Sequence, residues 1–261
     1  MARLGHEARL IPPAYVKPFA KRQKSDAADA EAICEAARRP TMRFVAVKSE
    51  EQQAAAMIVR TRDLLVRQRT QLINALRRHL GEFGLIVPQG ASQAGQLVAM
   101  VADPDAPLPD AARPALHALL CALEKLEGET RGLEAEIARR AREDETAHRL
   151  MTIPGVGPLM APVALAPAPQ TFRRGRDFAA WLGLTPRQHS TGGKQRLGAT
   201  TRMGERSLRR LLILGASSVV IRRRVHKEAQ PGTWLAGMLR RKPPLLVRVA
   251  LANRMARIVW A

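Results

Sequence analysis

The chain has 261 residues, a formal net charge of +20 and 46% hydrophobic residues, so it combines a strong basic excess with enough apolar side chains to bury real cores. Aromatic residues make up only 3% of the sequence, which argues against binding dominated by stacking of unpaired bases, and the single Tyr15 makes a tyrosine nucleophile a weak candidate. Two widely separated cysteines argue against a structural zinc site and indicate a reducing cytoplasm.

The basic excess lies in the last third of the chain. Residues 171–261 hold 20 Lys and Arg against three acidic residues, whereas residues 1–170 hold 23 against 20. A basic excess confined to one part of the chain is typical of a region that binds nucleic acid. We favour this interpretation over charge that only keeps the protein soluble, and over a basic surface that faces a membrane. The longest apolar run, residues 211–221, is shorter than the roughly 20 residues of a bilayer span, so we expect no membrane span, and we expect no signal peptide.

The first segment combines a short strand with a helix. Residues 7–11 are predicted to form a strand that Pro12 and Pro13 close, and no earlier segment offers it a partner. The strand is therefore an edge added to another sheet, or the N-terminal part of its domain is missing. Residues 24–38 follow as a predicted helix with Ser25 as its N-cap.

Two long helices are predicted next. Residues 50–80 repeat leucine or isoleucine every seven positions, and residues 114–147 place apolar side chains at a and d heptad positions, with Thr130 as the polar exception. Residues 103–110 form a linker rich in Pro and Asp between them. The helices can pair as an antiparallel hairpin within one chain or between two subunits, and the pattern leaves both open.

The pattern changes at residues 151–158. Their sequence, Met-Thr-Ile-Pro-Gly-Val-Gly-Pro, matches the turn of a helix-hairpin-helix, in which glycines let backbone N–H groups approach a DNA phosphate. Prolines at 162 and within 166–169 stand where the second helix should continue, so we expect a short or distorted hairpin. Beyond it we predict a short helix over 177–182, a polar glycine-rich loop over 185–201, and helices over 205–224 and from 245 to the end.

Asp26 and Asp29 form the first candidate site. They lie three residues apart on the predicted helix, so their carboxylates share a face and can converge on one cation. Carboxylate oxygens suit Mg²⁺, which assists phosphoryl chemistry. Acids in the first turn of a helix also complement its macrodipole without binding any metal, and spacing alone leaves both interpretations open.

A basic loop with Ser190, Lys194 and Arg196 forms the second candidate site. It is not a P-loop, because Gln188 and Gln195 stand where that motif needs Gly and Ser or Thr, and no G-x-S-x-G surrounds the serine. Ser190 can attack a phosphodiester while the two cations neutralise the phosphate charge. The other interpretation is a turn that only hydrogen-bonds a backbone phosphate.

In this order the segments resemble the DEDD-type insertion-sequence transposases, a family with a RuvC-like N-terminal domain and a C-terminal domain that carries a catalytic serine. The clearest motifs are Lys-Ser-Asp-Ala-Ala-Asp-Ala-Glu-Ala-Ile at 24–33, Ile-Pro-Gly-Val-Gly-Pro at 153–158 and His-Ser-Thr-Gly-Gly-Lys at 189–194. Further matching stretches cover residues 10–19, 180–186 and 250–257, so the resemblance spans nearly the whole chain.

The resemblance implies that Asp26 and Asp29 are the last two acids of the family's Mg²⁺-binding tetrad. It implies that Ser190 is the nucleophile and forms a covalent phosphoserine link with DNA. It also implies subunit contacts through a coiled coil, which indicates a homo-oligomer, and in some members a guide RNA from the element's own end. The residues that we expect to contact DNA are Gly155, Val156, Gly157, Lys194, Arg196, Arg202, Arg206, Arg209 and Arg210.

The fold class that follows is mostly α. We expect a remnant of an RNase H/RuvC-like α/β domain over 1–49, a coiled-coil helical hairpin over 50–148, and a basic C-terminal transposase domain with a helix-hairpin-helix-like turn over 149–261. The family's first Asp and its Glu precede residues 10–13, in strands with no match in this chain, and Glu7 does not replace that Glu. We therefore expect an N-terminally truncated copy that binds Mg²⁺ weakly and is catalytically impaired.

Three functions remain in competition. The first is a recombinase that binds, cleaves and transfers DNA strands during transposition of an insertion sequence. The second is a non-catalytic nucleic-acid-binding fragment that competes with an intact relative, and the third is a helix-hairpin-helix structural or repair protein. Replacing Ser190 by alanine separates the first from the others, because only a recombinase then loses covalent attachment to DNA.

Overall fold

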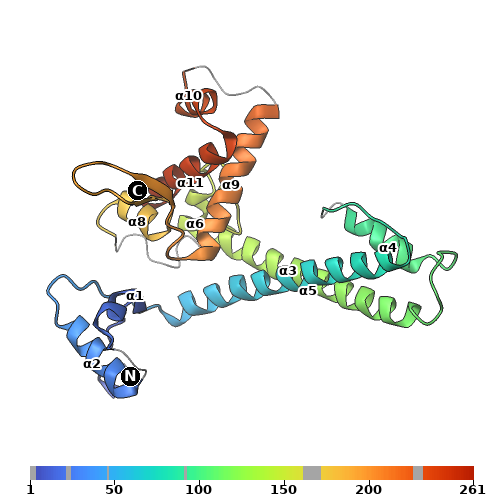
Figure 1. Ribbon diagram of the computed structural model, residues 1–261, viewed down its shortest axis with the longest axis horizontal. Coiled ribbons are helices and arrows are strands. Elements are labelled where there is room, and N and C mark those ends of the chain that lie inside the picture. Colours follow the sequence, from blue (N-terminus) through green and yellow to red (C-terminus); the bar gives the residue numbers. More distant parts are fainter. Residues whose placement is uncertain (1–3, 22–24, 46, 91–92, 161–171, 226–231) are drawn as a thin grey trace. The chain divides into compact units, whose positions relative to one another are not determined.

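The computed structural model describes residues 4–21, 25–45, 47–90, 93–160, 172–225 and 232–261. The protein is mostly helical, with a single two-stranded sheet among these residues (Figure 1), which confirms the mostly α prediction. The chain divides into two compact units, Met1–Gln53 and Ala54–Ala261.

The N-terminal unit is built from short helices. α1 (Pro13–Val16) and the 3-10 helix η2 (Lys17–Phe19) precede α2 (Asp26–Ala37). The predicted cap of α2 is confirmed, because the Ser25 hydroxyl accepts a hydrogen bond from the Ala28 N–H at 3.2 Å. The first turn of α2 therefore begins at Asp26, where the sequence places its two carboxylates.

The predicted strand over residues 7–11 is wrong. Only Leu10 pairs in a β fashion, as an isolated antiparallel bridge with Val45, whose N–H donates to the Leu10 carbonyl at 2.8 Å. The partner thus lies later in the same unit rather than before the segment. A single bridge has no alternating pattern, so nothing in the sequence around Val45 indicated it.

Two long helices, α3 (Glu50–Glu82) and α5 (Arg113–Glu143), lie side by side in antiparallel orientation (Figure 1). Leucines of both helices share one apolar cluster, which includes Leu76 and Leu80 of α3 and Leu116 of α5. Two ion pairs join the helices in opposite residue order, Arg62 with Glu134 and Arg69 with Glu127. The two helices thus pair as an antiparallel hairpin within this chain.

The ends of the long helices have clear chemical causes. α3 begins with a capping box, in which the Ser49 and Gln52 side chains accept hydrogen bonds from each other's backbone N–H groups at 3.1 and 3.0 Å. The single helix predicted over 114–147 is wrong, because α5 stops before Asp144. The Asp144 carboxylate accepts from the Ala147 N–H at 2.7 Å and starts a separate helix, α6 (Glu145–Leu150).

A helix that the sequence analysis did not predict, α4 (Ala94–Ala102), packs on α5 beside the predicted linker. It buries Leu97 in the same apolar cluster. The linker itself is fastened by Arg113, whose guanidinium donates to the carbonyls of Asp103, Pro104 and Ala106 at 3.2, 2.8 and 3.0 Å. This Pro-rich stretch is therefore an ordered connection.

The C-terminal part forms the largest core. Its elements are α8 (Gly175–Trp181), β1 (Pro186–Gln188), β2 (Leu197–Thr200), α9 (Arg206–Val225), α10 (Trp234–Arg241) and α11 (Pro244–Trp260). α11 lies against both α8 and α9 and buries Met255 and Ala256 between them (Figure 1). Val59 of α3 and Ile137 of α5 reach the same core. The helices predicted over 177–182, over 205–224 and from 245 are confirmed, whereas α10 was not predicted.

Candidate nucleic-acid interface

The predicted glycine-rich loop over 185–201 is in fact a β-hairpin. β1 and β2 pair in antiparallel orientation, with Pro186 opposite Thr200. The hairpin closes through a bridge between Thr191 and Lys194. The loop prediction is wrong because nearly all of the hairpin's side chains are exposed, so no apolar alternation marks the strands.

Two glycines make the turn at the tip of this hairpin. Gly192 and Gly193 have φ angles of 55° and 75°, in the left-handed region that glycine enters without strain. Turns with two left-handed residues match the twist of the flanking strands, which is why Gly-Gly is common there. The Gly-Gly-Lys sequence therefore forms a hairpin tip that presents Lys194.

Ser190 lies on the exposed part of this hairpin, next to the tip. Its Oγ accepts a hydrogen bond from the Arg196 backbone N–H at 3.1 Å. The two arms of the hairpin are also joined by the His189 N–H, which donates to the Arg196 carbonyl at 2.8 Å. The hydroxyl is therefore held in place by backbone geometry while it stays accessible to a phosphate in solution.

The four arginines predicted to contact DNA after the hairpin differ in environment. Arg202 is exposed and has a φ of 56°, the one positive φ among the described residues other than glycine. Arg206 is exposed at the start of α9, and Arg210 is exposed with one guanidinium nitrogen 3.7 Å from the Asp63 carboxylate of α3. Arg202 and Arg206 are thus the freest of the four for a phosphate contact.

Arg209 has a structural environment instead. Its Nη1 donates to the Leu182 and Met203 carbonyls at 3.0 and 2.6 Å, so the side chain fastens the start of α9 to the segments beside it. Burial lowers the pKa of Arg209, and the neighbouring Arg206 acts in the same direction. Its hydrogen bonds are directed to the protein rather than to solvent.

The predicted DNA-binding turn packs against α9. Gly155 has a φ of 90°, and a Cβ there would lie 2.7 Å from the Gly215 carbonyl oxygen, so the two backbones touch. Val156 is buried, and its N–H donates to the Ile153 carbonyl at 2.9 Å. Gly157, by contrast, has open space where a Cβ would stand. The second helix of the predicted motif, over 161–171, lies outside the described residues.

Asp26 and Asp29 are exposed in the first turn of α2. Over the part of the chain that the structure describes, no three His, Cys, Asp or Glu side chains come together as a metal site. Two carboxylates fall short of the octahedral oxygen shell that Mg²⁺ requires, unless water and phosphate oxygens complete it. The residues present here do not by themselves fit the ion. Asp26 and Asp29 belong to the N-terminal unit, whereas Ser190 belongs to the second.

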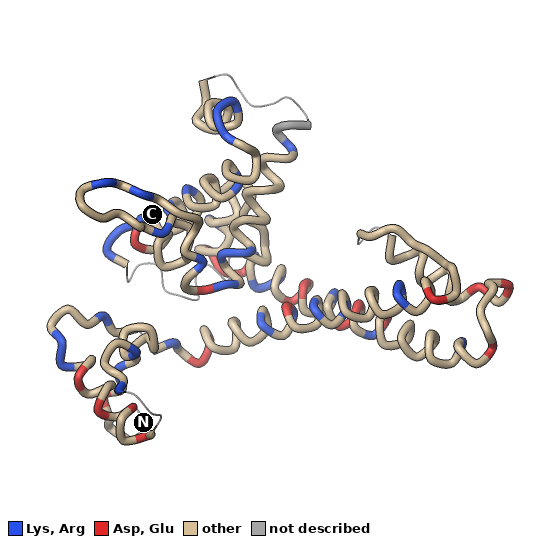
Figure 2. The backbone as a smooth tube through the Cα atoms, viewed as in Figure 1, with Lys and Arg blue, Asp and Glu red and all other residues tan. Residues whose placement is uncertain are grey.

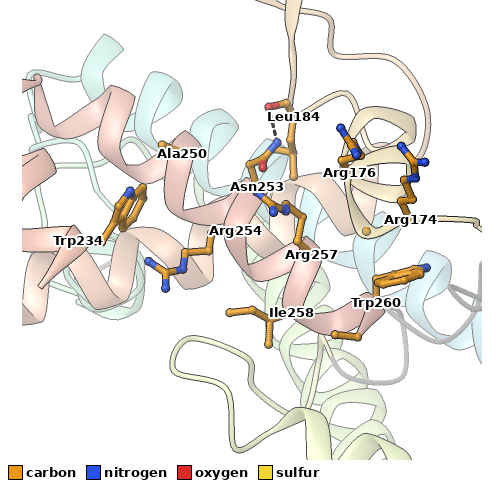
Figure 3. Close-up of a pocket in the computed structure, with 12 residues that line it drawn as sticks. Arg174, Arg176, Leu184, Trp234, Ala250, Asn253, Arg254, Arg257, Ile258 and Trp260 are labelled. Atoms are coloured by element: carbon orange, nitrogen blue, oxygen red, sulfur yellow. Dashed lines mark hydrogen bonds between the residues drawn. The ribbon is translucent and has the colours of Figure 1, made fainter.

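A basic cleft stands out that the sequence analysis did not identify (Figure 3). It has a volume of about 1190 Å³ and lies along α11, between α8 and the start of α10. Arg254 and Arg257 lie on the predicted C-terminal helix, but nothing in the sequence connects them with Arg174 and Arg176, which precede them by 78 to 83 positions. The charged and aromatic side chains that line it are Arg174, Arg176, Trp234, Arg254, Arg257 and Trp260.

Basic side chains are spread over the whole C-terminal part. Figure 2 shows Lys and Arg along the hairpin, α9 and α10, with few acidic residues between them. Acidic residues are instead more frequent along α3 and α5, where they alternate with arginines. Among the helices that the structure describes, none has the length and apolarity to cross a membrane.

Comparisons with known proteins agree on one family. A family model described as the transposase IS116/IS110/IS902 family matches residues 147–230, and a second model, described as a transposase, matches residues 2–84. The chain is 49% identical over 265 residues to a Pseudomonas aeruginosa protein named as a probable family 20 transposase, covering 100% of this chain and 78% of that protein.

Two further relatives match over the full chain. The y4pF/y4sB protein of Sinorhizobium fredii is 47% identical over 264 residues, with 100% of this chain and 67% of that protein covered. The transposase for insertion sequence element IS1328 of Yersinia enterocolitica is 38% identical over 266 residues, with 100% and 78% covered. The identity thus extends through both compact units.

Proposed function

The chain belongs to the IS110 family of DEDD transposases, and from this premise we propose that it acts on DNA as an insertion-sequence transposase with Ser190 as its nucleophile. The observation that supports this role is the position of the hydroxyl. It is exposed on the β-hairpin and accepts a hydrogen bond from the Arg196 N–H, with Lys194 on the same hairpin.

The proposed step is a transesterification. Ser190 Oγ attacks the phosphorus of a phosphodiester, a new Oγ–P bond forms, and the bond from phosphorus to one deoxyribose oxygen breaks. The serine gives up its proton and the departing deoxyribose oxygen takes one up, so no oxidant or cofactor is consumed. Lys194 and the Arg196 side chain neutralise charge that develops on the phosphate oxygens.

We propose that the remaining basic residues position the DNA. Arg202 and Arg206 are exposed near the hairpin and suit phosphate contacts, whereas Arg209 supports the fold under them. Gly157 leaves room for a backbone N–H to approach a phosphate, whereas Gly155 serves the packing of the turn. We therefore propose that residues 151–158 contact a DNA phosphate as the turn of a helix-hairpin-helix does.

Asp26 and Asp29 are proposed as part of the family's divalent-metal site, in a RuvC-like segment over 1–49. When bound, such an ion supplies charge neutralisation at the attacked phosphate. Because the two carboxylates alone do not fit Mg²⁺, we expect the 261-residue polypeptide to bind it weakly and to cleave slowly. Assembly through the helical hairpin over 50–148 and binding of a guide RNA are further parts of the proposal.

The test is a search for DNA covalently bound to protein. The polypeptide is incubated with labelled duplex from the end of its element, and denaturing electrophoresis detects a protein–DNA band. Ser190→Ala is expected to abolish the band, whereas Thr191→Ala removes the adjacent hydroxyl and is expected to keep it. A band that persists in Ser190→Ala shows that another residue is the nucleophile.

A second candidate function is nucleic-acid binding without strand cleavage. The observation that favours it is the absence of a three-ligand metal cluster among the described residues. In that case no variant gives a covalent band, although the unmodified polypeptide still retards labelled duplex on a native gel.

A further inference from the structure

The cleft along α11 concentrates cationic and aromatic groups with no opposing charge. Four of its lining residues are arginines and two are tryptophans, and none is acidic. Over the described part of the chain, no acidic side chain forms an ion pair with any of the four arginines, which are Arg174, Arg176, Arg254 and Arg257. Unpaired guanidinium groups on a concave surface favour a polyanion as the ligand.

The walls of the cleft are firmly held. The Asn253 side-chain amide donates to the Leu184 carbonyl at 3.2 Å (Figure 3). The Trp260 indole N–H donates to the Phe172 carbonyl at 2.9 Å. A Cβ at Gly175 would lie 3.1 Å from the Arg257 carbonyl oxygen, so α8 and α11 are in close backbone contact. A ligand therefore meets a preformed surface and loses little affinity to reorganisation of the protein.

The Arg254 guanidinium positions Trp234 at one end of this surface. The Arg254 guanidinium carbon lies 5.1 Å from the centroid of the Trp234 ring, within the range of a cation–π interaction (Figure 3). The tryptophan still exposes 39% of its surface. It thus offers exposed aromatic surface next to a guanidinium, the combination that binds a base and its phosphate together.

The size of the cleft points to a segment of a polymer. Its volume of about 1190 Å³ exceeds the roughly 300–1,000 Å³ of pockets that enclose small molecules. Arginines lie along its length rather than around one point, since Arg174 and Arg176 come from the start of α8 and Arg254 from α11 opposite α10 (Figure 3). Spaced cations of this kind match successive phosphates of a chain.

We propose that this cleft binds an unpaired stretch of nucleic acid, with the arginines on its phosphates and a base stacked on Trp234. The inference rests on the proposed function, because a transposase is what makes nucleic acid the expected polyanion. Bases in a duplex are stacked on each other, so an exposed indole face selects for unpaired nucleotides. The overall scarcity of aromatic residues conceals this site, since two of the three tryptophans in the chain line it.

The cleft also adjoins the proposed nucleophile along the chain. Leu184 lines the cleft, and the hairpin that carries Ser190 begins at Pro186. A strand that has been unpaired beside the hairpin can therefore be held by the same unit. Two kinds of nucleic acid present the same phosphates and unpaired bases to this cleft: a displaced DNA strand and an RNA.

Fluorescence anisotropy tests the inference with labelled single-stranded DNA, single-stranded RNA and duplex DNA of the same sequence, about 12 nucleotides long. Trp234→Leu is expected to weaken binding of unpaired strands about fivefold or more, while Trp234→Phe restores it and duplex affinity is unchanged. Arg254→Ala combined with Arg257→Ala is expected to weaken binding of unpaired strands about tenfold. A larger loss on RNA than on DNA identifies RNA as the source, and the reverse identifies a displaced DNA strand.

The matched control is Arg78→Ala combined with Arg142→Ala, which removes two exposed arginines from α3 and α5. Thermal unfolding of each variant verifies that the fold is retained. The inference is overturned if the cleft variants bind unpaired strands as the control does. If the unmodified chain binds duplex but no unpaired strand, the cleft inference alone fails, and if it binds neither, the proposed function fails with it.

Discussion

The contact between Gly155 and Gly215 shows what single residues do in this fold. A Cβ at either position would lie 2.7 or 2.1 Å from the other's carbonyl oxygen, distances that no folded protein maintains. The sequence interpretation assigned Gly155 to DNA because the surrounding turn matched a phosphate-binding pattern. Its close approach is to α9 instead, and no feature of the sequence near residue 155 indicates residue 215 as a neighbour.

We predict that Gly215→Ala lowers the free energy of unfolding by about 1–3 kcal/mol, because the added methyl group forces two backbones apart. Gly155→Ala is expected to cost at least as much, since its φ of 90° also disfavours a side chain. Chemical denaturation measures both. Gly157→Ala is the control, because a Cβ there meets no atom within 4 Å, and equal losses in all three variants would contradict the prediction.

A second prediction separates two neighbouring arginines. Arg209→Ala removes two hydrogen bonds to carbonyls and is expected to lower the free energy of unfolding by about 1–3 kcal/mol. Arg206→Ala, at an exposed position, is expected to leave stability unchanged and to weaken DNA binding. Denaturation and binding titrations on both variants check this. The assignment of roles is refuted if Arg206→Ala is the less stable variant.

At the scale of elements, the helices were the easiest part to predict. The apolar repeat and the Ser25 cap gave α2 and α3 nearly to the residue, because both signals are local. The break at Asp144 was missed, since only the carboxylate cap reveals the new helix. The hairpin around Ser190 was missed because its side chains face solvent, and the cleft was missed because its walls are far apart in sequence.

We predict that the α3–α5 pair depends on its buried leucines. Leu76→Ala is expected to lower the free energy of unfolding by about 2–5 kcal/mol, because the side chain is fully buried in the shared apolar cluster. Leu64→Ala on the same helix removes a side chain that is 45% exposed and should cost far less. Urea titrations followed by circular dichroism measure the difference, and similar midpoints for the two variants would count against this packing.

For the whole molecule, the charge asymmetry governs how binding responds to salt. Each phosphate contact releases condensed counterions, so affinity for duplex DNA is expected to fall steeply as salt is raised. We predict that Lys194→Ala combined with Arg196→Ala reduces the slope of log affinity against log salt by about two. Titrations at several salt concentrations measure this slope. Arg78→Ala combined with Arg142→Ala should leave this slope unchanged. An equal reduction of the slope in that control variant would mean that the phosphate contacts are not specific to the hairpin.

Because Val59 and Ile137 pack into the C-terminal core, the order in which the chain is synthesised affects how it folds. α3 and α5 are complete once Glu143 has been made, so they can pair early, as local helical contacts generally do. The core that covers these two residues also needs Met255 and Ala256 of α11, which are synthesised long after Glu143. Until then, an apolar end of the helical pair stays uncovered in the nascent chain. Ribosomes that stall between α5 and α11 would therefore release an aggregation-prone intermediate, and synthesis of α11 is the step that allows this apolar end to be covered.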